Sequence, residues 1–249
     1  MSIKISDTIR LEVAGENALM LYFSEHEHNE KQTTAVANEE INSNVQQAVQ
    51  LIQKHLSADI IDLIPSYASI LVMFNLLEID HHHMRNKLKK LLSSCGNQSI
   101  KQGRLIELPA YYSLESGQDL PRIAEKAQMS IEQVISLHQG QEYRVYAIGF
   151  APGFAYLGEV DERIAMPRLV TPRLKVPKGA IAIADRQTAV YPAQSPGGWN
   201  IIGLCPIDMF NPDADTPMSV AVGDRVKFVA IDRHEFIKLG GVLPTTSRE

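Results

Sequence analysis

The sequence predicts an α+β protein in which a small N-terminal α+β sandwich is followed by a β-barrel domain. Strand-like and helix-like segments alternate over residues 9–92, and a polar, glycine-containing stretch follows at 93–103. From Tyr143 onward, short β-rich segments alternate with Gly and Pro turns. This texture is typical of β-barrels and β-sandwiches.

The N-terminal part predicts the order strand, strand, helix, strand, strand, helix. The stretch 29–56 lacks Pro and Gly, and from Ala37 its apolar residues recur every three or four positions, which predicts one long amphipathic helix. Helices packed on one face of an antiparallel sheet would make a compact unit, which we place at residues 1–95. The apolar patterning predicts strands at 9–13, 18–23, 60–64 and 69–75 and a second helix at 82–92.

The second domain is predicted at residues 103–240, because the preceding segment 93–102 is polar and contains a glycine. It begins with an expected strand at 103–111, and two short helices follow before residue 140. The later strands are expected at 144–148, 180–184, 188–191, 200–204 and 225–231.

Polar residues mark the ends of the two short helices. Asp119 is a candidate N-cap for the first helix, and Ser130 with Gln133 has the spacing of a capping box for the second. His138 lies near the end of that second helix, where a histidine cation is expected to cap the C-terminus.

Composition and charge exclude several classes of protein. The chain has 249 residues and a formal charge of −5 without a long basic run, so we expect no nucleic-acid binding. It has no apolar run of ~20 residues and no signal-like N-terminus, so a cytoplasmic protein that does not enter a membrane is expected. Cys95 and Cys205 are too few for a cysteine-based zinc site, and the adjacent histidines 81–83 diverge, so we predict no metal site.

The densest functional signal lies in residues 149–203, which hold 7 of the 15 glycines and 6 of the 13 prolines. Glycine allows close backbone approach and proline fixes the backbone. Such constrained turns form either a rigid binding rim or a tight barrel, and the pattern alone leaves both open.

A basic segment within this region runs from Arg163 to Lys178 and carries five positive charges and no acid. A proline precedes a cation every five residues, and prolines keep such a segment extended. Arginine on a stiff backbone offers a two-pronged donor to a carboxylate or phosphate. Arg168, Arg173 and Lys178 are therefore candidate phosphate or substrate-binding residues, and a solvated edge segment is the alternative.

Two glycine-rich turns supply the other candidates. Residues 149–158 place glycines and a proline around Phe150, Phe154 and Tyr156, which suits either contact with a planar ligand or anchoring of a core turn. Trp199, the only tryptophan, could lie over a flat ligand ring or plug the end of the barrel. The candidate binding residues of this kind are Gly153, Phe154, Gln187, Gly197, Gly198 and Trp199.

Several catalytic motifs are missing from the sequence. It contains no G-x-x-x-x-G-K-[ST] phosphate loop, no G-x-G-x-x-G fingerprint and no G-x-S-x-G elbow. No evident nucleophile–base pair stands out either, so catalytic residues stay unassigned.

Four strings of residues resemble the family of the bacterial 5-oxoprolinase B subunit: IPSYASILVMFN, GFAPGFAYLG, PRLVTPRLKVPKGAIAIADRQTAVYPAQSPGGWNIIG and VAVGDRVKF. The family is shared with allophanate hydrolase subunit 1, the matching part of urea amidolyase and a sporulation histidine-kinase inhibitor. The resemblance covers about Ile9 to Asp232. Asp185-Arg186, where a small turn is usual, and Cys205, where threonine is common, depart from the family pattern.

The resemblance implies a cyclophilin-like β-barrel for the second domain and an enzyme that acts as a complex. With the A and C subunits of 5-oxoprolinase, the chain would open 5-oxo-L-proline to L-glutamate with ATP hydrolysis, ATP being bound with Mg in the complex. A direct hetero-complex with the C subunit is implied, and the loop of Phe150, Phe154 and Tyr156 is expected to contribute to it. The alternatives are an inhibitor that binds a sensor histidine kinase and a protein of an allophanate- or urea-metabolising complex.

Overall fold

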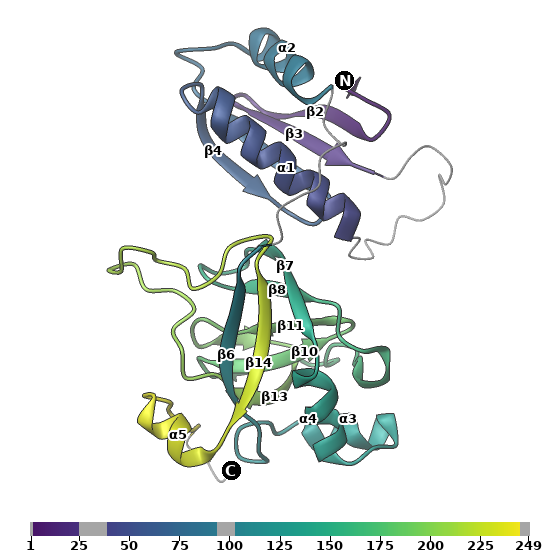
Figure 1. The fold of residues 1–249 in the computed structure, drawn as a ribbon, viewed down its shortest axis with the longest axis vertical. Helices are drawn as coiled ribbons and strands as arrows, with labels where there is room; N and C mark the ends of the chain where they lie inside the picture. Colours follow the sequence, from purple (N-terminus) through teal and green to yellow (C-terminus); the bar gives the residue numbers. More distant parts are fainter. Residues whose placement is uncertain (1, 25–38, 94–102, 245–249) are drawn as a thin grey trace. The chain divides into compact units, whose positions relative to one another are not determined.

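The computed structural model describes residues 2–24, 39–93 and 103–244. The chain divides into two compact units, Met1–Gln102 and Gly103–Glu249, called here the N-terminal unit and the barrel unit (Figure 1). Cys95 and the first part of the helix predicted at 29–56 lie outside the described residues. None of the helices in the described ranges combines the length and the apolar composition of a membrane span.

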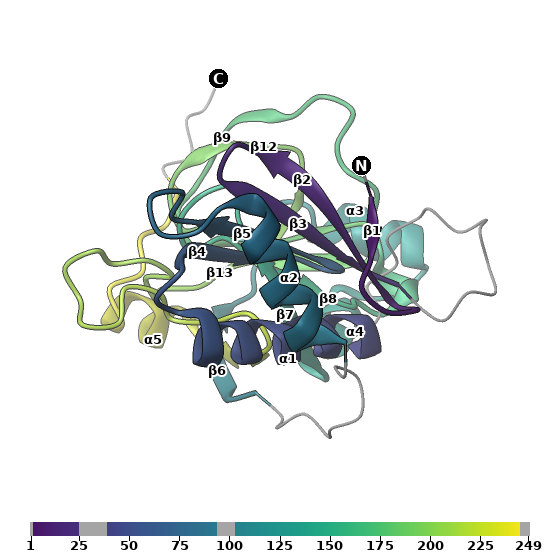
Figure 2. The same cartoon turned by 90° about the horizontal axis from the view of Figure 1, so that it is seen from above.

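The N-terminal unit is an antiparallel sheet with two helices packed on one face (Figure 2). The helix α1 (Glu39–Leu56) buries the residues spaced three and four apart, among them Val45 and Ile52, against the apolar side of the sheet. Asp80 caps α2 (His81–Leu92) by accepting a 2.8 Å hydrogen bond from His83 N. The strands, in sheet order, are β1 (Ile3–Lys4), β2 (Ile9–Gly15), β3 (Ala18–Phe23), β5 (Ser69–Phe74) and β4 (Ile60–Pro65).

The barrel unit closes seven strands of the described chain into a barrel in the order β10-β11-β8-β7-β14-β6-β13. This confirms the predicted α+β class with a β-barrel as the second domain, and it excludes a β-sandwich for that domain. The pair β14–β6 is parallel, whereas the other pairs are antiparallel. The barrel strands are β6 (Leu105–Tyr111), β7 (Glu142–Ile148), β8 (Ala155–Gly158), β10 (Ala180–Ala184), β11 (Gln187–Val190), β13 (Asn200–Leu204) and β14 (Arg225–Ile231).

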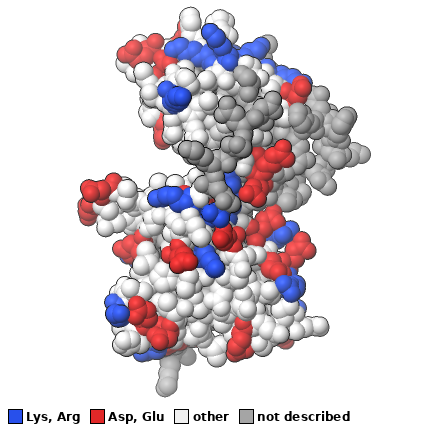
Figure 3. Space-filling view, viewed as in Figure 1, with Lys and Arg blue, Asp and Glu red and all other residues white. Residues whose placement is uncertain are grey.

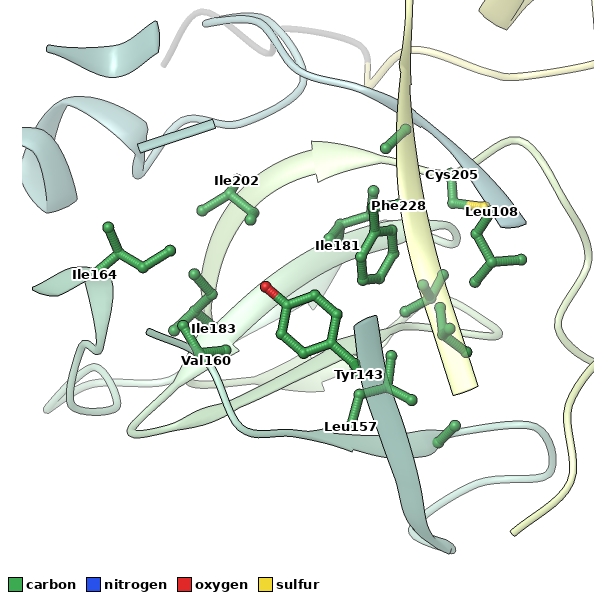
Figure 4. Packing of buried hydrophobic residues seen from close by; sticks show 14 of the residues in the cluster. Leu108, Tyr143, Leu157, Val160, Ile164, Ile181, Ile183, Ile202, Cys205 and Phe228 are labelled. Atoms are coloured by element: carbon green, nitrogen blue, oxygen red, sulfur yellow. The ribbon is translucent and has the colours of Figure 1, made fainter. Parts of the chain in front are cut away.

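The sequence AIAIA of β10 explains how one barrel wall serves two cores. Side chains alternate across a strand, and here Ile181 and Ile183 point into the barrel interior with Tyr143 and Phe228 (Figure 4). The alanines of β10 face outward and are also buried, in a second cluster that contains Trp199. The small alanine face lets bulky aromatic side chains pack closely against the outside of the wall.

A two-stranded antiparallel sheet, β9 (Arg173–Val176) with β12 (Ser195–Gly197), accompanies this second cluster (Figure 2). Val176 belongs to the cluster and is fully buried. These two strands were not predicted, because both are short and contain or follow proline. The remaining elements of the barrel unit are α3 (Leu120–Ala127), α4 (Ile131–Gln139), the 3₁₀ turn η1 (Glu162–Ile164) and α5 (Arg233–Lys238).

The capping box predicted for α4 is confirmed. Ser130 Oγ accepts a 3.2 Å hydrogen bond from Gln133 N, and Gln133 Oε1 accepts a 2.8 Å hydrogen bond from Ser130 N. This reciprocal pair satisfies backbone donors that a helix start leaves free.

Candidate functional site

The basic segment 163–178 lies along the barrel unit and includes β9, but its five cations do not form one cluster. Arg163 binds Asp161 next to it, with 2.7 Å between Nη2 and Oδ2. Lys178 pairs with Asp208 at 2.6 Å, and both side chains are about half exposed. An exposed salt bridge of this kind contributes little to stability, so Asp208 restrains Lys178 only weakly. The predicted role of Lys178 in binding stays a prediction.

Arg173 is held by the protein itself. Its Nη2 donates to Asp119 Oδ1 at 2.7 Å, and its Nη1 donates to the carbonyl oxygen of Trp199 at 3.2 Å. The side chain of Arg173 is 24% exposed and that of Asp119 only 8%. Arg173 therefore fixes β9 to the start of α3, and it is less available to a ligand than its position in the sequence suggested.

Asp119 is not the side-chain cap that the sequence predicted. It stands at the N-cap position of α3, but its backbone is helical (φ −97, ψ −2) and its side chain makes no capping bond. Its Oδ2 accepts a 2.7 Å hydrogen bond from Ile201 N in β13 instead. The predicted N-cap position is confirmed, but the carboxylate does not cap the helix, because two tertiary donors, Ile201 N and Arg173, take it up.

Arg168 is the cation of the segment that lies over an aromatic ring. Its guanidinium carbon is 5.7 Å from the centre of the Trp199 ring. The side chain is exposed, and within the described ranges its guanidinium has no acid or carbonyl acceptor. Arginine stacked on an indole keeps its planar edge free for a carboxylate or phosphate.

The aromatic cluster beneath Arg168 packs as part of the fold, and its predicted contact with a planar ligand stays a prediction. Trp199 and Phe154 are buried, 5% and 2% exposed, so both serve the packing of the barrel wall. The Phe154 ring makes edge-on contacts with Tyr156, Tyr191 and Trp199 at 4.9–5.6 Å. Phe150 contacts Phe154 at 5.2 Å but is 66% exposed. The cluster is thus a buried aromatic layer on the outside of the barrel wall, with one aromatic side chain at its surface.

The predicted glycines shape this neighbourhood by close contact. Gly153 has φ +81, and a Cβ there would lie 2.7 Å from the Met209 carbonyl oxygen. At Gly197 a Cβ would lie 2.4 Å from the Tyr191 hydroxyl. Gly198 has ordinary space around it, but its carbonyl accepts a 2.7 Å hydrogen bond from Leu169 N, which fixes the basic segment beside Trp199.

Gln187 lies at the start of β11, where it pairs with Ala184 and Gly158. The adjoining turn holds Asp185, with φ +52, and Arg186, which pairs with Glu159 at 2.6 Å and with Glu162 at 2.9 Å. The arginine of the dipeptide that departs from the family pattern is therefore engaged within the fold. A ligand role for Gln187 stays a prediction.

His138 contradicts its prediction as a capping cation. It is fully buried, and burial lowers its pKa from 6.5 to about 3. Thr188 Oγ1 donates its single proton to Ala182 O at 3.0 Å, so His138 Nε2 donates to Thr188 at 3.0 Å. His138 Nδ1 then accepts from the Tyr112 hydroxyl at 2.7 Å. These buried hydrogen bonds join neutral groups and link α4 to the barrel wall. No short-range pattern in the sequence indicates them.

Neither the buried cysteine nor the distribution of acidic and basic side chains indicates a further reactive site among the described residues. Burial raises the pKa of the Cys205 thiol to about 12, which keeps it protonated. Among the described residues, no group of three or more His, Cys, Asp or Glu side chains could hold a metal ion. Basic and acidic side chains are interspersed over the face of the barrel unit shown in Figure 3, without a broad field of one sign.

The arrangement supports anion recognition at one place in particular. Arg168 offers a free guanidinium above a rigid aromatic base, and Lys175 of β9 is exposed and has no ion pair within the described ranges. Lys175 was not among the predicted site residues, although its position in the basic segment could have suggested it. No described constellation supplies a nucleophile with its base.

Comparison with known proteins gives consistent results. Residues 9–220 match the family model described as carboxyltransferase domain, subdomain C and D. The 5-oxoprolinase B subunit of Bacillus subtilis (strain 168) is 34% identical over 237 residues, which are 91% of this chain and 95% of the relative. The match therefore runs through both units.

Two solved structures are also similar. A conserved uncharacterized protein of Pyrococcus horikoshii is 41% identical, with a TM-score of 0.53 over 91% of this chain and 99% of that one. The crystal structure of TTHA0988 has a TM-score of 0.73 and 32% identity over 86% of this chain. This chain matches only 40% of the length of TTHA0988, so the greater part of that protein lies outside the shared module.

Proposed function

The chain belongs to the family of the 5-oxoprolinase B subunit, and from that membership we propose that it is the B subunit of an ATP-dependent 5-oxoprolinase. The observation that carries this proposal is the 34% identity to the Bacillus subtilis protein, which extends over almost the whole of both chains. Together with the A and C subunits, it forms a complex that opens 5-oxo-L-proline to L-glutamate while ATP is hydrolysed.

The chemistry explains why cations matter in such a complex. A lactam carbonyl is a poor electrophile, and transfer of a phosphoryl group to its oxygen makes attack by water feasible. Phosphoryl transfer depends mainly on positioning and on charge stabilisation by cations. ATP supplies that phosphoryl group, with Mg bound in the assembled complex.

Arg168 is the residue of this chain that we assign to that task. Its guanidinium is exposed, has no acidic partner in the described structure and is oriented by the Trp199 ring at 5.7 Å. Arg173 supports it indirectly, because its bond to the Trp199 carbonyl oxygen keeps the aromatic base in place. In this proposal Arg168 binds a phosphate or the substrate carboxylate, and Arg173 is a positioning residue.

Reconstitution from purified proteins tests the function. The A and C subunits are mixed with or without this chain, and ATP hydrolysis that depends on 5-oxoproline is measured. The proposal requires activity with all three proteins and no useful rate from this chain alone. Full activity of the other two proteins without the chain would exclude it.

The two other functions implied by the family resemblance stay predictions. No described feature favours an inhibitor of a sensor histidine kinase, or a protein of allophanate or urea metabolism, over the oxoprolinase role. Inhibition of such a kinase by the chain, without effect of the chain on the oxoprolinase reaction, would favour the first of them.

A further inference from the structure

We propose that an exposed ridge on the barrel unit is the surface on which the C subunit docks, and that this partner presents an apolar and acidic face to it. The ridge consists of Phe150, Val170, Leu174 and Lys175. The inference rests on the proposed function, because that function supplies the partner.

Three large apolar side chains of the ridge are open to solvent. Val170 is fully exposed, Leu174 is 87% exposed and Phe150 is 66% exposed. Single exposed apolar residues are normal on protein surfaces. A group of them at one place marks an interaction surface instead.

Contacts through the aromatic cluster join the ridge into one neighbourhood. Phe150 packs on Phe154, whose ring is 5.6 Å from Trp199, and Arg168 covers Trp199 from outside. Val170 follows Arg168 by two residues. Leu174 belongs to β9, which pairs with β12 just before Trp199.

The backbone under the ridge is rigid. Pro167 O accepts a 3.0 Å hydrogen bond from Asn200 Nδ2, and Leu169 N donates to Gly198 O at 2.7 Å. On either side of Leu174 along β9, Arg173 is bound to Asp119 and Val176 is fully buried. A surface that is already ordered loses little conformational entropy when a partner binds, so exposed Leu and Val side chains held in this way suit docking.

The charge of the ridge indicates the charge of its partner. Of the five cations in 163–178, Arg163, Arg173 and Lys178 pair with acids of this chain. Arg168 and Lys175 do not, within the described residues, and Lys175 alone is left for the partner, because Arg168 is assigned to the phosphate or substrate. An unpaired cation beside exposed apolar side chains is complementary to a carboxylate next to an apolar patch.

A related protein carries additional polypeptide in the same chain as the shared module. In TTHA0988 the shared module accounts for 40% of the chain, and more than half of that protein is additional polypeptide. A stable interface buries about 1,200–2,000 Å² in total. The ridge is too small to supply all of this area, so we assign it the central contact residues of a larger interface.

The experiment measures the binding of the full-length chain to the purified C subunit by titration calorimetry, without ATP or 5-oxoproline. Leu174→Glu places a carboxylate on the ridge and is expected to raise the Kd ~30-fold or more. The matched control is Leu77→Glu, because Leu77 is 94% exposed and lies in the N-terminal unit. Neither substitution should lower the melting temperature, since both side chains are in solvent.

A second variant tests the charge. Lys175→Glu should slow association and weaken its dependence on salt, since exposed charges at an interface act mainly on the association rate. Binding of Leu174→Glu with the affinity of the unsubstituted chain would overturn the docking inference and leave the proposed function standing. No binding of the unsubstituted chain to the C subunit would count against the proposed function itself. Self-association of the isolated chain that Leu174→Glu abolishes would assign the ridge to a second copy and overturn the inference.

Discussion

Arg173 and Asp119 lie 54 residues apart in the sequence and are joined by a 2.7 Å hydrogen bond between Nη2 and Oδ1. The other oxygen of Asp119 accepts from Ile201 N at 2.7 Å. One carboxylate thereby connects the start of α3, strand β13 and strand β9. Arg173 extends the connection to Trp199 through the carbonyl oxygen of that residue. The arginine expected to bind a ligand thus orders the base on which Arg168 lies.

Arg173→Ala should lower both stability and activity. The substitution leaves the carboxylate of Asp119 largely buried without its cation, which costs about 2–3 kcal/mol. Denaturant titration followed by Trp199 fluorescence measures this cost, since the chain has one tryptophan and it is buried. An unchanged midpoint would mean that the pair contributes nothing to the fold.

Arg168→Ala should lower the activity of the assembled complex by roughly 30- to 1,000-fold, the usual loss when a charge-stabilising contact is removed. Its melting temperature should hardly change, because the side chain is exposed and its contact with Trp199 is worth only about 0.5–1 kcal/mol. Arg168→Lys keeps the charge but not the planar fork, so an intermediate rate is expected.

Arg163→Ala is the matched control for Arg168→Ala, because Arg163 is an exposed cation of the same segment paired with its neighbour Asp161. It should leave the rate within a factor of about two. Equal rates for the two alanine variants would show that the basic segment is a solvated edge without a role in binding.

Gly153→Ala should destabilise the barrel unit by about 2–4 kcal/mol. Position 153 has φ +81, and the added Cβ would meet Met209 O at 2.7 Å and Phe210 Cβ at 2.8 Å. Gly149→Ala in the same turn is the control, since no atom lies within 4 Å of its Cβ position. The unfolding midpoints of the two variants decide the matter, and equal midpoints would contradict the assigned backbone strain.

The buried His138 should make the barrel unit sensitive to acid. Its pKa is lowered from 6.5 to about 3 by burial, so below pH 6.5 the unfolded chain binds a proton that the folded chain does not. This group has no effect on stability above about pH 6.5, and below that pH the free energy of unfolding falls by about 1.4 kcal/mol per pH unit down to about pH 3.

Proton NMR of the unsubstituted chain measures the titration of His138 directly, with His138→Gln used to assign its signal. The imidazole signal should not titrate between pH 8 and the onset of acid unfolding. A midpoint near 6.5 in the folded protein would contradict the buried hydrogen bonds that join neutral groups from Tyr112 to Thr188.

The sequence predicted correctly those features that depend on residues close together in the chain. The Ser130–Gln133 capping box formed as expected because both of its bonds connect residues three apart. The run 180–184 was predicted as a strand, because its residues are apolar and it lies between glycine and charged turns. Its two buried faces could not be assigned in advance, because the second face is covered by Trp199 and Tyr191 from later in the chain.

The roles of charged and polar residues were harder to predict for the same reason. Whether Arg173 meets a ligand or an acid depends on α3, which precedes it by about fifty residues. His138 lies at a helix end where a cation is favourable, but the contact with Thr188, 50 positions away, places it in the core. Tertiary packing decides such cases, and no pattern within a short window encodes it.

The most direct test of the account is a titration of the A and C subunits with this chain, in which glutamate formed from 5-oxo-L-proline is measured together with ADP. The account predicts that glutamate formation is negligible without the chain, rises as it is added and reaches a plateau, with ADP rising in parallel. Glutamate formation by the other two proteins that does not depend on the added chain would contradict it.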